Sequence, residues 1–127
     1  MPVRSLSSPV LKWPNGAEVD RAFRDCAHRI GRRHPGVVRI GYFGSYARGD
    51  WGVGSDLDAV VVLQSCHEPF ERRAAAWYPE GIPVPVDLLV YSIEEWERLV
   101  RTTPFGRRVA AETVWVYERP KDLGPGS

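Results

Sequence analysis

Apolar residues between Val19 and Ile30 recur at i, i+3, i+4 and i+7 spacing, with charged residues on the opposite side. This periodicity is typical of one buried face of an amphipathic helix. It predicts a helix from about Ala17 to Arg33. Asn15 is suited to cap the N-terminus of that helix, and the pair Pro35-Gly36 is expected to stop it.

Strands are indicated by short apolar segments rich in β-branched and aromatic residues. The predicted strands are Val37 to Phe43, Leu57 to Leu63, Val84 to Tyr91 and Thr113 to Tyr117. The second segment has so few polar positions that we expect both of its faces to be buried. Apolar and polar residues alternate along the last segment, which favours a strand with one solvated face.

Three further helices are expected between and after these strands. One covers about Pro69 to Tyr78, one covers Ser92 to Val100, and a short one begins at Pro104. The first should bury one stripe, formed by Phe70, Ala74 and Trp77. Ser92 and Glu95 have the spacing of a capping box. Helices flanking a small mixed sheet of about four strands define the predicted fold class, an α/β (α+β) sandwich.

Length and composition indicate one globular domain. The chain has 127 residues, of which 43% are hydrophobic and 26% charged. We expect a single domain, 1–127, with an ordered core of about 15–119 and a flexible tail at 120–127. The net charge of +1 argues against direct nucleic-acid binding. No apolar run approaches the ~20 residues of a membrane span, and no signal-peptide core is visible, so we expect a cytoplasmic protein without membrane contact.

Several other chemistries are not supported by the residue pattern. Cys26 and Cys66 make no disulfide framework and no zinc-ligand spacing, so we expect reduced thiols. No Walker A or Gly-x-Gly-x-x-Gly sequence is present, which argues against P-loop and Rossmann folds. The histidines are expected on the surface. Most tryptophans are expected in the core, but Trp51 lies in a glycine-rich loop and is a candidate contact to a base or a partner.

Two carboxylates stand at the start of the second predicted strand. Asp56 and Asp58 are separated by one residue, so strand alternation places both on one face. Two like charges about 5 Å apart repel by roughly 1–3 kcal/mol. A cation between them removes this cost, and oxygen ligands favour Mg²⁺ or Mn²⁺.

A third carboxylate, Asp87, interrupts the third predicted strand, which otherwise has the composition of a buried strand. An isolated buried carboxylate is costly, so we expect Asp87 to be paired, hydrogen-bonded or bound to a metal. If the two strands are neighbours, Asp56, Asp58 and Asp87 converge. Such a set can hold two metals about 3.5–4 Å apart for in-line phosphoryl transfer.

Phosphate-binding features follow the first predicted strand. Gly44 allows a phosphate to approach the backbone, and Ser45 adds a hydroxyl donor beside the following amides. Arg48 lies one helical turn further on, where its guanidinium suits a triphosphate.

Each of these residues also has a plainer interpretation. Asp56 and Asp58 could form a solvated turn that enters a strand, and Asp87 could pair with one of the many arginines. Arg48 could be an ordinary surface arginine, and Ser45 could cap a helix. The combined spacing favours the functional interpretation.

The set Gly44-Ser45, then ten residues, then Asp56-Leu57-Asp58, then the strand-borne Asp87 resembles the nucleotidyltransferase superfamily that includes DNA polymerase β and kanamycin nucleotidyltransferase. The Gly-Ser-x-x-Arg-Gly run at 44–49 and the Ser-Asp-Leu-Asp run at 55–58 look like those of the minimal nucleotidyltransferases. The resemblance extends from about Ala17 to Tyr117.

The resemblance implies a polymerase β-like fold and a Mg²⁺-dependent transfer of NMP, AMP from ATP, to a hydroxyl. It implies that Asp56 and Asp58 bind two Mg²⁺ ions with the triphosphate, and that Asp87 binds the catalytic metal and helps to deprotonate the acceptor. Ser45 and Arg48 would hold the β and γ phosphates, with Gly44 giving access.

The resemblance also implies a partner, because family members of this length are commonly encoded beside a HEPN-domain protein, often a toxin. The expected acceptor is a tyrosine of that toxin, with this chain acting as its antitoxin. One alternative is a non-catalytic antitoxin that neutralises its partner by binding. A further alternative is a transferase for a small hydroxylated molecule such as an aminoglycoside, in which a homodimer supplies the missing pocket wall.

Overall fold

A computed structural model describes residues 14–120 of the chain, and most of the predicted tail lies outside that range. The elements in chain order are α2 (Gly16–Arg33), β1 (Val37–Phe43), α3 (Ser45–Arg48), β2 (Leu57–Leu63), α4 (Phe70–Trp77), β3 (Val86–Ser92), α5 (Ile93–Thr102), α6 (Pro104–Glu112) and β4 (Val114–Glu118). The predicted strands and helices are therefore all present.

The four strands form one mixed sheet in the order β3-β2-β1-β4. β1 runs antiparallel to β2 and to β4, whereas β2 and β3 are parallel. The parallel pair is joined through α4, as a parallel connection requires a crossover. β2 is central, and its burial on both faces confirms the expectation from its continuous apolar run.

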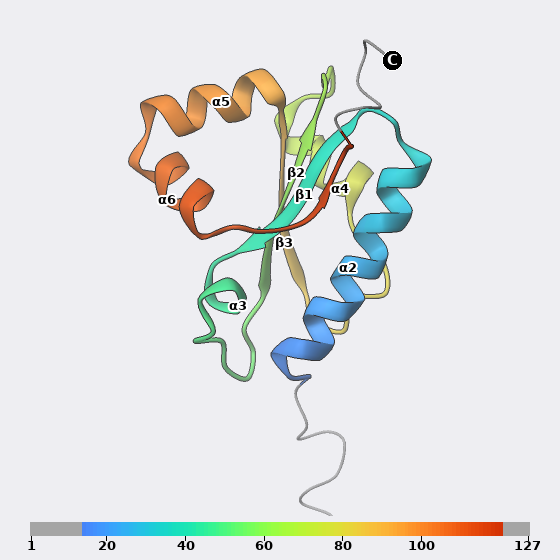
Figure 1. Cartoon of the computed structure of the whole chain (residues 1–127), viewed down its shortest axis with the longest axis vertical. Coiled ribbons are helices and arrows are strands. Elements are labelled where there is room, and N and C mark those ends of the chain that lie inside the picture. Colours follow the sequence, from blue (N-terminus) through green and yellow to red (C-terminus); the bar gives the residue numbers. More distant parts are fainter. Residues whose placement is uncertain (1–13, 121–127) are drawn as a thin grey trace, which may run out of the picture.

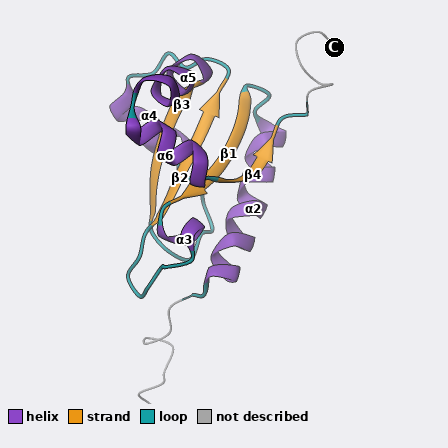
Figure 2. Ribbon diagram, turned by 60° about the vertical axis from the view of Figure 1, so that its left-hand side comes forward, coloured by secondary structure: helices purple, strands orange, loops and turns teal. Residues whose placement is uncertain are grey.

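Helices cover both faces of the sheet, which confirms the predicted sandwich (Figures 1 and 2). On one face α2 and α4 pack over a core that includes Phe23, Ile40 and Val61. On the other face α5 and α6 pack over a smaller core that contains Val60 and Trp96. Alternation along β2 divides its residues between the two cores, since successive side chains point to opposite faces.

Local sequence explains the helix starts. Asn15 caps α2 in a capping box with Glu18, and Ser92 caps α5 in a capping box with Glu95. α2 ends at Arg33, before Pro35, as predicted. β3 begins at Val86 instead of Val84, because Pro85 between them has no N–H to donate to a sheet ladder.

The buried stripe predicted for α4 is partly wrong. Phe70 is 50% exposed, and the residue of α4 that is fully buried is Arg73. The Arg73 guanidinium donates to the carbonyls of Glu68 and Val90 and to both carboxylate oxygens of Glu95. These four hydrogen bonds satisfy the buried guanidinium charge. Hydrophobic periodicity cannot reveal such a buried arginine, because its partners lie on other segments.

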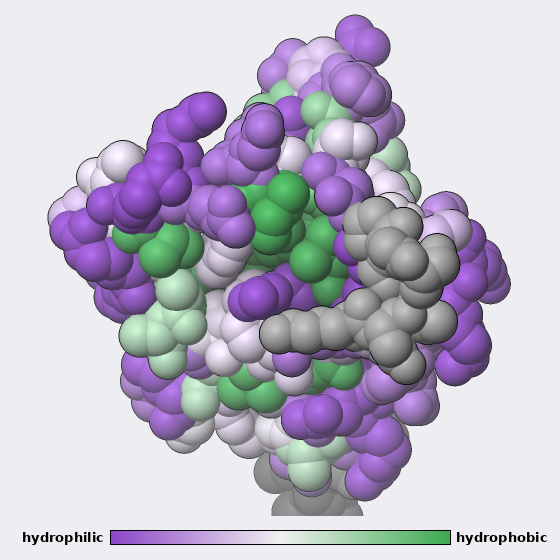
Figure 3. Space-filling view, turned by 45° about the horizontal axis from the view of Figure 1, so that its top comes forward, coloured by the Kyte–Doolittle hydropathy of each residue, from purple (hydrophilic) through white to green (hydrophobic). Residues whose placement is uncertain are grey.

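The smaller core stays partly open to solvent. A groove between α5, α6 and the sheet is lined by half-buried Ile93, Val100 and Trp115. Arg39 covers the Trp115 ring at 4.7 Å from its centroid. In the view of Figure 3, hydrophobic atoms gather in the middle of the face and hydrophilic residues surround them. None of the helices in residues 14–120 is long and apolar enough to traverse a bilayer.

Candidate active site

The candidate site lies where β1 ends and where β2 and β3 begin, next to the short helix α3 (Figure 1). The parallel register of β2 and β3 pairs Asp58 directly with Asp87. Neighbouring strands are about 4.8 Å apart, so the two carboxylates are side by side on one face. This is the face that also carries Val60 and the α5–α6 layer. The fold therefore brings Asp58 and Asp87 together, whereas the convergence of all three aspartates stays a prediction.

The three carboxylates differ in exposure. Asp58 is half-buried, whereas Asp56, just before β2, is exposed. Asp87 is also exposed, which corrects the expectation that it is a buried charge needing compensation. One reason is that β3 is an edge strand, with a neighbouring strand on one side only. The alternative of an arginine ion pair at Asp87 is absent from the salt bridges of residues 14–120.

Electrostatic coupling within this group is visible at Asp58. Burial raises the pKa of the Asp58 carboxyl above its usual range, and the charges of Asp87 and Asp56 raise that pKa further. The guanidinium of Arg48 acts in the opposite direction. A carboxylate whose ionisation is disfavoured by burial and by neighbouring carboxylates is a marker of functional sites and of cation binding.

The donor set fits a divalent cation of the Mg²⁺ type, because all of its members are hard carboxylate oxygens. The side chains are not gathered into a closed coordination group: within the described range no three His, Cys, Asp or Glu side chains are positioned together as metal ligands. Asp56 and Asp87 are exposed, so rotation of their side chains can bring their oxygens to a cation at Asp58.

Gly44 occupies a position that no other residue fits. Its φ of 76° and ψ of −150° belong to a region that L side chains rarely adopt. A Cβ at Gly44 would also collide with the Oδ2 atom of Asp58. The glycine therefore brings the backbone of this turn into direct contact with the central carboxylate.

The short helix α3 presents Ser45 and Arg48 beside this turn. The N-cap of α3 is Gly44, so the alternative that Ser45 is the cap is wrong. Arg48, whose side chain is 49% exposed, donates from Nε to Asp50 at 3.2 Å and from Nη1 to Glu112 at 3.2 Å. Arg48 is thus an exposed arginine held by two carboxylates, and its phosphate role stays a prediction.

The loop between α3 and β2 is closed by its own contacts. The Ser55 hydroxyl accepts a hydrogen bond from the Gly52 amide at 2.8 Å, which fixes the residue before Asp56. Trp51 is half-buried and stacks on Tyr46 with ring centroids 5.5 Å apart. Trp51 therefore packs the loop onto the fold, and its contact to a base or a partner stays a prediction.

Glu112 is a residue of this site that the sequence pattern did not reveal. Its Oε2 atom accepts a hydrogen bond from the Gly44 amide at 2.8 Å, although the two residues are 68 positions apart. The only local signal is an acidic residue at the C-terminus of a helix, where the helix dipole disfavours it.

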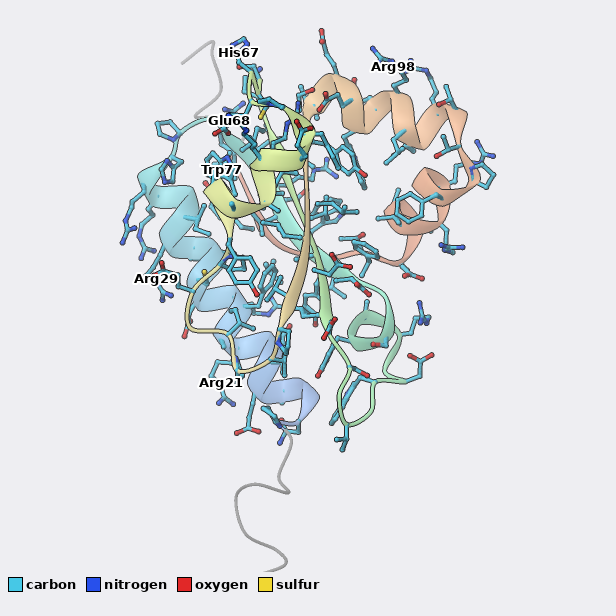
Figure 4. All side chains as sticks on the ribbon, turned by 180° about the vertical axis from the view of Figure 1, so that it is seen from behind. Arg21, Arg29, His67, Glu68, Trp77 and Arg98 are labelled. Carbon is cyan, nitrogen blue, oxygen red and sulfur yellow. The ribbon has the colours of Figure 1, made fainter. Side chains whose placement is uncertain are left out.

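Other titratable residues lie away from the site. His28, His34 and His67 are all exposed, as expected from the sequence. Figure 4 shows His67 and Glu68 at the end of the molecule opposite α3, and Arg21 and Arg29 pointing outward from α2. The chemistry-bearing side chains are therefore concentrated at one end of the sheet.

Comparison with known proteins places this arrangement in a family. The sequence profile of the nucleotidyltransferase domain matches residues 24–112. No curated protein sequence matches the chain significantly. Among solved structures, a Sulfolobus solfataricus protein described as a nucleotidyltransferase superimposes with a TM-score of 0.57 at 21% identity, covering 87% of this chain and 94% of that chain. This likeness shows a shared fold.

Two further solved structures have lower scores. A toxin–antitoxin complex with AMP-PNP gives a TM-score of 0.45 at 19% identity, covering 86% of this chain and 77% of that chain. A mutant of the toxin–antitoxin MntA–HpeT gives 0.44 at 17% identity, with the same coverages of 86% and 77%. The assignment depends on the sequence profile, whose match spans Gly44, the three aspartates and Glu112, and it shows that the chain belongs to the family of nucleotidyltransferase domains.

Proposed function

We propose that this chain transfers a nucleoside monophosphate, AMP from ATP, to a hydroxyl acceptor in a Mg²⁺-dependent reaction. The observation that carries the proposal is the pairing of Asp58 with Asp87 across adjacent strands, directly beside Gly44. Membership of the nucleotidyltransferase domain family supports the class of reaction. The carboxylates and the glycine turn supply the two kinds of group that a metal-bound triphosphate needs.

The phosphate side of the site is formed by α3 and the turn before it. Arg48 holds the β and γ phosphates, since a guanidinium matches phosphate geometry with paired donors. Ser45, at the first position of α3, donates its hydroxyl to the same phosphates. Gly44 leaves room for them, because it places no side chain beside the strand end.

The acceptor side is formed by the strand carboxylates. Asp56, Asp58 and Asp87 would hold Mg²⁺, which supplies charge neutralisation and polarisation of the phosphate when bound. Asp87 accepts the proton of the acceptor hydroxyl. The hydroxyl oxygen then forms a bond to the α-phosphorus while the bond between that phosphorus and the leaving pyrophosphate breaks. The exposure of Asp87 leaves it accessible to a large acceptor such as a protein.

The acceptor that we propose is a tyrosine hydroxyl of a HEPN-domain partner, with this chain acting as the antitoxin. The support is the resemblance of the 44–49 and 55–58 runs to the minimal nucleotidyltransferases. The exposure of Asp56 and Asp87 is compatible with a folded protein as substrate.

A second candidate function is a binding module that neutralises its partner without catalysis. One observation favours it: the carboxylates of the described range are not gathered as a closed ligand group. In this case the aspartates would only sense nucleotide or contact the partner.

The deciding experiment incubates the protein with the product of its neighbouring gene, Mg²⁺ and ATP, and measures the intact mass of both chains. We expect the partner to gain one or more AMP units and pyrophosphate to be released. A tight complex without any mass gain would replace the catalytic proposal with the binding module.

The matched variant replaces both Asp56 and Asp58 with Asn. We expect it to lose AMP transfer by at least about a hundredfold while it keeps its fold, because charge neutralisation at phosphorus is lost. Asp25→Asn, an exposed aspartate on α2, is the control and should retain full activity. Full activity in the double variant would contradict the role of the aspartates.

A further inference from the structure

We propose that Glu112 is a positioning residue that prepares both the Gly44 turn and Arg48 for the triphosphate. The inference rests on the proposed function, since it concerns the phosphate half of the same site. It assigns a role to a residue that contacts neither the acceptor nor the reacting phosphorus.

One carboxylate oxygen joins the two parts of the phosphate site. Glu112 Oε2 accepts from the Gly44 amide at 2.8 Å and from Arg48 Nη1 at 3.2 Å. The second oxygen, Oε1, is 3.5 Å from the same Nη1. A single side chain thereby fixes the distance between the end of β1 and the end of α3.

The placement of Glu112 is unfavourable unless these contacts matter. It is the last residue of α6, where the negative end of the helix dipole opposes an anion, and the last turn of α6 carries no basic residue. Its side chain is only 18% exposed, so water compensates little. The Gly44 amide and the Arg48 guanidinium are the groups that offset this cost.

The geometry of Arg48 distinguishes positioning from competition with phosphate. Asp50 occupies Nε and Glu112 occupies Nη1, while Nη2 makes no hydrogen bond within residues 14–120. The two carboxylates therefore hold the guanidinium at Nε and Nη1 and leave Nη2 for an anionic ligand. Ordering a long side chain before binding lowers the entropic cost of binding.

The Gly44 contact has a second effect. Glycine reaches this backbone conformation easily and is also free to leave it, so a contact is needed to hold the turn. The hydrogen bond to Glu112 fixes the Phe43–Gly44 peptide plane, one residue before α3 begins. Glu112 thus acts through the orientation of its neighbours.

The test measures ATP binding in the presence of Mg²⁺ by calorimetry for the wild type, Glu112→Gln, Arg48→Ala and the double variant. Glu112→Gln keeps an acceptor for the Gly44 amide but removes the charge that holds Arg48. We expect Kd for ATP to rise about tenfold in Glu112→Gln. In the Arg48→Ala background the same substitution should add no further loss, because the two residues act as a pair.

Steady-state kinetics distinguish a positioning role from a merely structural one, because the two roles affect KM and kcat differently. We expect KM for ATP to rise about tenfold in Glu112→Gln while kcat changes less than about threefold. Partial unfolding would lower kcat and leave KM unchanged. The matched control is Glu118→Gln on β4, which removes an exposed ion pair with Arg39 of β1. This variant should bind ATP like the wild type.

The outcomes separate the two proposals. If the wild type binds no nucleoside triphosphate, the proposed function fails and this inference fails with it. If the wild type binds ATP and Glu112→Gln binds equally or more tightly, or if its loss adds fully to that of Arg48→Ala, this inference alone is overturned. Should Glu112→Gln not fold, Glu112→Asp, which withdraws the carboxylate by one methylene, is expected to show the same rise in Kd.

Discussion

Gly44 shows how much of the site depends on a position without a Cβ atom. A Cβ there would meet the Asp58 carboxylate, and the backbone is in the positive-φ region. Gly49 shares the positive φ but faces open space, and Gly36 has neither constraint. The three glycines therefore form a series of increasing constraint, because Gly49 lies in the αL region whereas the ψ of −150° puts Gly44 in a region that is almost restricted to glycine.

We expect Gly44→Ala to destabilise the fold most, Gly49→Ala by about 1–2 kcal/mol from strain alone, and Gly36→Ala least. Gly44→Ala should exceed Gly49→Ala because its backbone region is more costly for alanine and because the Asp58 carboxylate must also move. Urea unfolding of the three variants gives the order. Equal losses in Gly44→Ala and Gly49→Ala would contradict both the greater strain and the tight contact with Asp58.

The aspartates and the glycine turn could be predicted at the residue scale because their spacing is short and local. Glu112 could not, because its partner Gly44 lies 68 residues away and nothing near Glu112 in the sequence points to it. The exposure of Asp87 was missed for a related reason: strand order, which places β3 at the edge, is not encoded in any short segment.

Among the elements, α4 and α5 are joined by the Arg73–Glu95 pair. The side chain of Arg73 is 7% exposed and that of Glu95 is 39% exposed, with Nη1 and Oε1 2.6 Å apart. Glu95 also completes the capping box of α5. The Glu95 carboxylate therefore caps the N-terminus of α5 and also pairs with the buried charge of Arg73 on α4.

We expect Glu95→Gln to lower the free energy of unfolding by about 1–2 kcal/mol at neutral pH, because Arg73 stays buried with a weaker partner. The hydrogen bond from Arg73 lowers the pKa of Glu95 below its usual range in the folded state. The stabilisation is therefore complete above the unfolded pKa and is lost as the pH falls through the lowered folded pKa.

Chemical denaturation from pH 7 to pH 3 measures this dependence. The difference between the wild type and Glu95→Gln should shrink toward acid. Glu97→Gln, an exposed glutamate on the same helix, should differ little from the wild type at any pH. A difference that is constant with pH would show that the charge of Glu95 is not responsible.

Element types and helix caps were predictable because Asn15, Ser92 and the prolines act within one turn of the chain. The burial of Arg73 was not, since its compensation comes from Glu68, Val90 and Glu95 after folding. A periodic pattern assigns burial by residue type and therefore favoured Phe70, which is half-exposed.

In the whole molecule, the sheet concentrates negative charge at one end, and this has a thermodynamic consequence. The folded-state pKa of Asp58 is raised, first by burial and then by Asp87 and Asp56. A raised folded pKa means that ionised Asp58 costs stability above that pKa, and the cost disappears as the pH falls below the unfolded pKa.

We expect Asp58→Asn to raise the metal-free stability at pH 7 by about 0.2–1 kcal/mol, because a like-charged cross-strand pair is removed. In the presence of Mg²⁺, the wild type should be more stable than Asp58→Asn. The wild type should gain about 2.7 kcal/mol at a Mg²⁺ concentration a hundred times its Kd, and Asp58→Asn should gain far less. Thermal unfolding with and without Mg²⁺ measures both effects, and an equal gain in the two proteins would exclude Asp58 as a ligand.

The order of synthesis separates the aspartates from the group that orders the turn beside them. Gly44, Asp58 and Asp87 precede Glu112 and β4 (Val114–Glu118), and β4 returns to pair with β1. Until β4 has left the ribosome, β1 lacks one of its two neighbouring strands, and until α6 has folded the Gly44 amide lacks its acceptor. Nascent chains that carry Asp56, Asp58 and Asp87 without Glu112 therefore lack an ordered Gly44 turn, and we expect them to bind nucleotide more weakly than the folded domain.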